Sequence, residues 1–121
     1  MSLDEIVSTY CAAWNEKDET ARSALLEKSW GDAGVYEDPT GVAPAGRAGL
    51  HAHIGGFHNA YPGARIVPTS KVDEHHGKIH FTWHMVQPDG TVAIDGRDFG
   101  EIDATGRIVH IVGFFGPPPA L

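Results

Sequence analysis

Two aspartates lie in local sequences that suit a carboxyl group for proton transfer. The first, Asp38, ends a predicted strand and comes directly before Pro39, within the stretch 35–41. Proline holds the preceding residue in extended geometry and supplies no backbone N–H to stabilise an ionised carboxylate. In an apolar cavity the pKa of Asp38 would rise, and the carboxylate would be a useful base near neutrality. Asp-Pro followed by glycine is also typical of a turn, and local sequence alone favours the alternative that Asp38 caps a turn.

The second, Asp98, lies in a predicted strand over residues 92–103 and shares its face with Gly96 and Gly100. Glycines within a strand mark a bulge, a bend or the close approach of another group, so we expect them to leave space around Asp98. An apolar setting there favours the protonated carboxyl group. The phenol of Tyr10 is a third candidate, because it is part of an apolar helical stripe and either satisfies a backbone carbonyl or donates into a pocket.

Three predicted helices precede most of the strands. Ser2 and Glu5 have capping-box spacing, and apolar residues recur behind them at helical intervals to about residue 15. Asp18 is a good N-cap for a second helix that fades before residue 30. The loop 41–46 is either the entrance to a pocket or a plain connection. A third helix stops at residues 62–63 and places apolar side chains on one face: Leu50, Ile54, Phe57 and Tyr61.

The period then changes from helical to alternating. Residues 66–72 form a predicted strand weakened by Pro68, which favours an edge position. Residues 79–85 alternate apolar and polar, and the turn 88–90 leads back into the strand 92–103. A last apolar strand covers residues 108–115. This order predicts a single α+β domain over residues 1–121, with three helices packed on one face of a curved, mixed or antiparallel sheet.

Composition narrows the possible partners and compartment. The chain has 121 residues and a formal net charge of −7, and its nine lysines and arginines are scattered, so it would repel nucleic acid. The single cysteine, Cys11, can form no internal disulfide, which fits a reducing cytoplasm. No stretch has the length of a membrane span, and the N-terminal residues lack the regions of a signal peptide. We therefore expect a cytoplasmic protein that binds neither nucleic acid nor membrane.

The chain resembles the SnoaL-like group of the nuclear transport factor two-like superfamily. The resemblance covers nearly the whole chain: the element order, the stretch 35–41, Gly46-Arg47 before the third helix, and the stretch 96–99 ahead of 106–108. It implies a cone-shaped α+β domain in which helices and a bent sheet enclose a deep pocket. It is specific for the superfamily and does not single out one activity, because one fold can carry many functions.

Within that superfamily the chemistry is similar to that of ketosteroid isomerase. The resemblance implies Asp38 as the base that removes a proton next to a carbonyl, with Tyr10 and a protonated Asp98 as donors to the enolate. That enzyme supports its oxyanion tyrosine with two further tyrosines, whereas the corresponding residues here are Trp30 and Ile54. SnoaL-type polyketide cyclases imply the alternative, with Asp98 as acid and base. Limonene epoxide hydrolase fits less well, because the last strand here offers no inward carboxylate.

Apolar side chains from several elements are expected to form the pocket walls and bind the ligand. The alternative is that they simply fill the core, as apolar stripes usually do. The residues that we assign to ligand binding are Trp14, Ile54, Phe57, Phe81, Trp83, Met85 and Phe115.

Eight histidines raise the question of a metal site. On the third helix His51 and His58 share a face while His53 points elsewhere, so these three do not converge. His80 and His84 lie on the outer face of their strand, where His110 could join them. We expect this outer sheet face to pack against a second copy of the chain in a homodimer rather than to bind metal, and we expect no cofactor.

Three functions are compatible with these patterns. The first is an enzyme, an isomerase or cyclase, that transfers a proton next to the carbonyl of a small apolar molecule, with Asp38 as base or with the two aspartates exchanging roles. The second is a binding module that holds a hydrophobic ligand without turnover. The third is a dimeric scaffold that uses only its outer sheet face.

Overall fold

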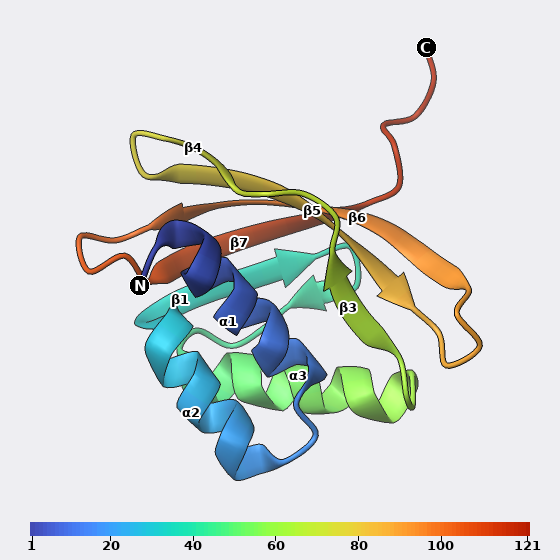
Figure 1. The fold of residues 1–121 in the computed structure, drawn as a ribbon, viewed down its shortest axis with the longest axis horizontal. Helices are drawn as coiled ribbons and strands as arrows, with labels where there is room; N and C mark the ends of the chain where they lie inside the picture. The colour runs from blue at the N-terminus through green and yellow to red at the C-terminus, as the bar shows by residue number, and fades with distance from the viewer.

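The fold is that of a computed structural model, which describes residues 1–121. Three helices, α1 (Leu3–Asn15), α2 (Glu19–Ser29) and α3 (Arg47–Ala60), lie together on one side of a seven-stranded mixed sheet. Figure 1 shows this two-layer arrangement, with the long strands above the helices. The predicted α+β class with three helices on a mixed sheet is confirmed. None of these helices is long and apolar enough to span a membrane.

The sheet order brings distant parts of the chain together. The strands are β1 (Trp30–Asp38), β2 (Gly41–Val42), β3 (Arg65–Pro68), β4 (Asp73–His75), β5 (Lys78–Val86), β6 (Val92–Ile102) and β7 (Ile108–Phe115). Their order is β2-β1-β7-β6-β5-β3, and β4 also pairs with β5. β1 and β7 are parallel, whereas the other pairs are antiparallel. The last strand therefore separates β1, which carries Asp38, from β6, which carries Asp98.

The helix boundaries follow the capping residues. Ser2 and Glu5 form the capping box of α1, and Asp18 accepts a hydrogen bond of 2.8 Å from the backbone N–H of Ala21 at the start of α2. Each cap satisfies backbone donors that would otherwise be unpaired in the first turn. The start of α3 is different, because Gly46 has a positive φ of 94° and no side-chain cap.

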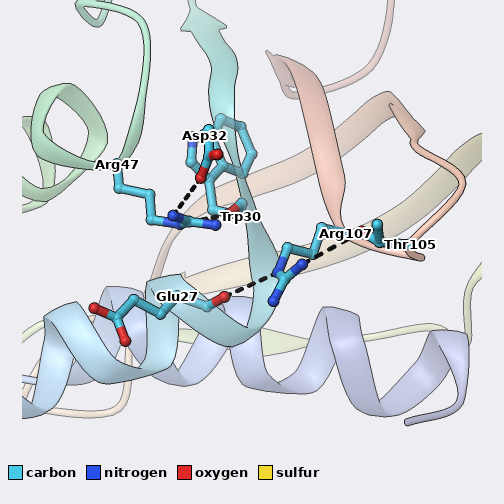
Figure 2. A network of polar contacts seen from close by, with 6 residues as sticks. All are labelled: Glu27, Trp30, Asp32, Arg47, Thr105 and Arg107. Carbon is cyan, nitrogen blue, oxygen red and sulfur yellow. Dashed lines mark hydrogen bonds and ion pairs between the residues drawn. The ribbon is translucent and has the colours of Figure 1, made fainter.

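Two arginines fix the helices to the sheet. Arg47, at the start of α3, donates from Nε to the carbonyl of Trp30 at 2.8 Å and forms an ion pair with Asp32. Arg107 donates from Nε to the carbonyl of Glu27 in α2 at 2.9 Å (Figure 2). The first of these contacts fixes the start of α3 against β1, and so sets which face of α3 is turned toward the sheet.

One strand prediction needs correction near the sheet edge. The strand expected over residues 66–72 ends at Pro68, which cannot donate a ladder hydrogen bond. A short strand, β4, follows at Asp73–His75 and pairs with β5. The turn is made by His76 and Gly77, whose φ values are both positive.

The expectation that Gly96 and Gly100 leave open space around Asp98 is wrong. A Cβ at Gly96 would lie 2.2 Å from the indole of Trp83, and one at Gly100 would lie 2.0 Å from the carbonyl oxygen of His110. The two glycines therefore allow close packing. At Gly96 the missing side chain lets the Trp83 ring pack closely against β6, near Asp98.

Candidate active site

A cavity of about 360 Å³ lies between α1, α3 and the inner face of the sheet. Thirteen of its eighteen lining residues are hydrophobic, so it suits a small and mainly apolar ligand. Its polar lining includes both candidate aspartates and Tyr10. The lining residues are Tyr10, Cys11, Trp14, Tyr36, Asp38, Thr40, His53, Gly56, Phe57, Ala60, Tyr61, Ile66, Phe81, Trp83, Met85, Ile94, Asp98 and Phe115.

Asp38 reaches the cavity but is fully engaged as a hydrogen-bond acceptor. Its Oδ1 accepts from the backbone N–H of Thr40 at 2.7 Å and from the Thr40 hydroxyl at 2.6 Å, and its Oδ2 accepts from the Tyr36 hydroxyl at 2.6 Å. His53 Nε2 lies 3.9 Å from Oδ2. Both sequence interpretations of Asp38 therefore describe part of the structure, since the residue closes a turn onto Thr40 and also lines the cavity.

The expected rise in the pKa of Asp38 is wrong. Burial raises the pKa, but the approach of His53 and the hydrogen bonds from Thr40 and Tyr36 outweigh burial and hold it well below the ordinary value of an aspartic acid. Pro39 supplies no backbone donor to Asp38, but Thr40, the next residue, supplies two. Asp38 is consequently a fixed negative charge and a weak base.

Asp98 has the opposite environment. Only 4% of the residue is exposed, and its Oδ1 has no hydrogen-bond partner. Burial raises the pKa of Asp98 to about 7, the nearby indole N–H of Trp83 opposes that rise in part, and the charge of Asp38 adds to it. A carboxyl group with this pKa can both take up and release a proton near neutrality.

Gly113 on β7 brings the two carboxyl groups close together. A Cβ at this position would lie 3.1 Å from Asp98 Oδ1 and 3.3 Å from the Cβ of Asp38. The two aspartates therefore lie on the same face of the sheet on either side of a residue without a side chain. This proximity explains why the charge of Asp38 acts on Asp98.

Tyr10 is a donor without a partner. It is 2% exposed, its ring stacks on Trp30 with a centroid distance of 5.7 Å, and its hydroxyl makes no hydrogen bond. Burial and the charge of Asp98 raise the pKa of Tyr10 well above its ordinary value, so the phenol keeps its proton. Of the two sequence alternatives, a bond to a backbone carbonyl is not made.

Three buried polar atoms that line this one cavity therefore have no partner: the Tyr10 hydroxyl, the Trp83 indole N–H and Asp98 Oδ1. Buried polar groups are nearly always hydrogen-bonded, and each exception needs an explanation. Trp83 was expected from the sequence only as an apolar wall. Its N–H makes it a candidate donor as well.

The other predicted ligand-binding residues divide into two groups. Trp14, Phe57, Phe81, Met85 and Phe115 line the cavity together with Trp83. Ile54 is absent from the lining, because it is fully buried in the core. Trp30, compared above with a supporting tyrosine, stacks on Tyr10 and lies outside the cavity lining.

Sequence reasoning missed three polar residues of the site, namely Tyr36, Thr40 and His53. Tyr36 lies two residues before Asp38 in the same strand, so the strand period of two already placed both on one face. His53 lies four residues before Phe57 in α3, and the helical period already placed it beside a predicted wall residue. His51 and His58 are not in the lining, and no three histidine, cysteine or carboxylate side chains in the structure are placed to hold a metal ion.

Comparison with known families decides what kind of domain this is. The SnoaL-like domain family model matches residues 7–111. The chain belongs to the SnoaL-like family. This SnoaL-like domain is also similar to a solved SnoaL-like family protein from Agrobacterium tumefaciens, provisionally named an isomerase, with 33% identity and a TM-score of 0.88 over 97% of this chain and 100% of that one.

Two more distant structures share the fold of this SnoaL-like domain. One is a Catenulispora acidiphila protein with a ketosteroid isomerase-like fold, 15% identical, with a TM-score of 0.73 over 93% of this chain and 85% of that one. The other is a Sinorhizobium meliloti protein provisionally named a polyketide cyclase, 17% identical, with a TM-score of 0.69 over 90% of this chain and 93% of that one. No curated protein matches the chain.

Proposed function

We propose that the protein is an enzyme that transfers a proton at the carbon next to a carbonyl group of a small, largely apolar molecule, in an isomerase or cyclase reaction. The observation that supports this most is the group of three unpartnered polar atoms, from Tyr10, Trp83 and Asp98, in one apolar cavity. The provisional names of the Agrobacterium and Sinorhizobium proteins agree with this reaction class.

Asp98 is the proton-transfer group in this proposal. Its ionised carboxylate removes a proton from the carbon beside the carbonyl, and the carbonyl oxygen becomes an enolate oxygen. The Tyr10 hydroxyl and the Trp83 indole N–H donate hydrogen bonds to that oxygen, which stabilises the developing charge. In an isomerase Asp98 then returns the proton to a second carbon. In a cyclase the enolate carbon attacks a second carbonyl carbon, and the oxygen of that carbonyl takes the proton from Asp98.

The geometry supports Asp98 over Asp38 as the base. Asp38 already accepts three hydrogen bonds, which stabilise its ionised form and weaken it as a base. Asp98 has a free oxygen and a pKa of about 7, close to the value at which a base is both ionised and basic at neutral pH. The roles therefore follow the polyketide cyclase alternative more closely than the ketosteroid isomerase one.

The proposed function is tested by proton exchange at carbon in heavy water. A panel of small cyclic and aryl ketones is incubated with the protein, and loss of the NMR signal of the hydrogens next to the carbonyl is followed. We expect exchange above the buffer rate for at least one ketone, with a rate that rises as pH approaches 7. Thermal stabilisation by a ketone without exchange would instead favour the binding module.

Trp83→Phe is expected to lower the turnover number about tenfold to a hundredfold with little change in KM. The substitution removes the indole N–H and keeps an aromatic wall, so it should affect the transition state more than substrate binding. Trp30→Phe is the matched control, because Trp30 has a buried and unpartnered indole N–H outside the cavity lining. Equal losses in both variants would remove Trp83 from the donor role.

We also propose that the outer sheet face pairs two copies of the chain. Phe99 and Phe114 are 40% and 47% exposed there, and the His80 ring stacks on Phe99 at 4.3 Å. Exposed aromatic rings at the centre of a sheet face favour a protein interface. Sedimentation should show a dimer for the wild type and a monomer for the Phe99→Ser, Phe114→Ser double variant. Val42→Ser, at an exposed apolar residue of β2, should leave the dimer intact.

A further inference from the structure

The cavity has negative charge without an arginine or a lysine to balance it. Two of its lining residues are aspartates, Asp38 and Asp98, and none is an arginine or a lysine. The approach of His53 and the hydrogen bonds from Tyr36 and Thr40 keep the Asp38 carboxylate ionised although its side chain is only 6% exposed. Asp98 Oδ1 adds a buried oxygen that accepts no hydrogen bond, although the indole N–H of Trp83 lies near this carboxyl group. A buried charge is costly unless an opposite charge accompanies it, so the cavity favours a positive ligand.

Aromatic rings surround the same space. We call Trp14, Tyr36, His53 and Phe57 the aromatic corner. The Trp14 ring lies 5.2 Å from Tyr36, 5.5 Å from Phe57 and 5.8 Å from His53, with interplanar angles of 52°, 74° and 81°. Rings inclined to one another in this way present several faces and edges to one volume, and the negative face of an aromatic ring attracts a cation.

The form of the Asp38 site indicates what kind of cation is suitable. Both oxygens of Asp38 already accept hydrogen bonds, so the residue offers charge but little remaining capacity to accept N–H donors. A metal ion needs several ligands gathered around one point, and no three histidine, cysteine or carboxylate side chains are placed in that way here. An alkylated ammonium group needs charge and aromatic surface but no hydrogen bonds, which agrees with a mainly hydrophobic lining.

We propose that the cavity binds an organic cation, with an alkylated ammonium group between the aromatic corner and the two aspartates. This inference deepens the proposed function and rests on it, because it makes the substrate a carbonyl compound that carries such a group. The positive charge would offset Asp38 while negative charge develops on the enolate oxygen. The ammonium group would then face the aromatic corner, and the reacting carbon would face Asp98. The carbonyl oxygen would face the donors of Tyr10 and Trp83.

Cation binding is coupled to the proton on Asp98. A positive ligand stabilises the ionised carboxylate, so binding should release a proton and become tighter as pH rises toward and past 7. A neutral ketone that accepts a hydrogen bond from protonated Asp98 would show the reverse dependence. Other titratable groups from α1, β1, α3 and the residue after α3 line the same cavity: Tyr10, Cys11, Tyr36, Asp38, His53 and Tyr61.

The test compares two probes of nearly equal shape that differ in charge. Choline carries a trimethylammonium group, and 3,3-dimethylbutan-1-ol replaces its nitrogen with carbon. Binding of each to the wild type is measured by calorimetry and by the fluorescence of the cavity tryptophans at pH 5.5 and pH 8. We expect choline to bind at least tenfold more tightly than the alcohol at pH 8, and this ratio to fall at pH 5.5.

Variants locate the site of this preference. Asp38→Asn should remove most of the choline preference without weakening the alcohol, and Asp98→Asn should reduce the proton release that accompanies binding. Glu101→Gln, on the exposed side of β6, removes a negative charge away from the cavity and should change neither. Equal or tighter binding of the neutral alcohol by the wild type at pH 8 would overturn the inference.

The outcomes separate this inference from the proposed function. Proton exchange on neutral ketones, together with no preference for choline, would support the function and reject the cation. A choline preference without exchange on either neutral or ammonium-bearing ketones would support the cation and reject proton transfer.

Discussion

Replacement of Asp98 by asparagine is expected to lower the rate of proton exchange next to a carbonyl by about 10²–10⁴-fold, the usual contribution of a positioned acid or base. Asparagine has nearly the same shape and cannot ionise, so the fold and the apolar walls should be retained. The residue is 4% exposed and its Oδ1 makes no hydrogen bond, so the substitution breaks no existing contact of that oxygen. The measurement is the exchange assay, with ligand affinity determined in parallel.

Asp38→Asn is the matched comparison for this prediction. It removes a carboxylate whose oxygens are already occupied by Thr40 and Tyr36, so its effect on the rate should be smaller, about tenfold, and should come from the lost charge. If Asp38→Asn abolished exchange while Asp98→Asn kept it, the base would be Asp38. The roles would then be those implied by the ketosteroid isomerase resemblance.

The stability of the wild type is expected to fall by about 3 kcal/mol between pH 5 and pH 8 because of Asp98. The pKa of this residue is about 7 in the folded protein against 3.8 when exposed, so the folded state holds the proton more tightly. Its stabilising contribution is complete below the unfolded value and is lost as pH rises through the folded one. Between pH 5 and the folded pKa of about 7, the free energy of unfolding falls by about 1.4 kcal/mol for each pH unit, which gives the expected change.

Urea unfolding of the wild type and of Asp98→Asn at both pH values isolates this contribution. Other groups titrate in the same range, and His58, whose burial lowers its pKa, has an opposite effect on stability. Subtracting the pH dependence of the variant's unfolding free energy from that of the wild type cancels the contributions of these other groups. Asp38 has a depressed pKa, so its contribution is lost only as pH falls below about 4 and does not enter this window. An equal pH dependence in both proteins would contradict a raised pKa for Asp98.

The local elements were predictable because their signals are local. The capping box at Ser2 and Glu5 and the apolar stripe behind it predicted α1 to its last residue, Asn15. The alternation over residues 79–85 predicted the buried and exposed faces of β5. The prediction of the edge strand was less accurate. The end of β3 at Pro68 and the turn at His76 depend on pairing with β5, and a local sequence pattern does not reveal the partner strand.

The sequence by itself determined the order of the elements, their periods and the face that each side chain occupies, because these depend on backbone geometry and near neighbours. Only the tertiary structure decided the chemistry of the two aspartates. Asp38 and Asp98 have the same side chain, but Thr40 and Tyr36 stabilise one as an anion while burial without a partner raises the pKa of the other. A pKa depends on charges, donors and desolvation in three dimensions, and here the order β1-β7-β6 places both carboxyl groups beside Gly113.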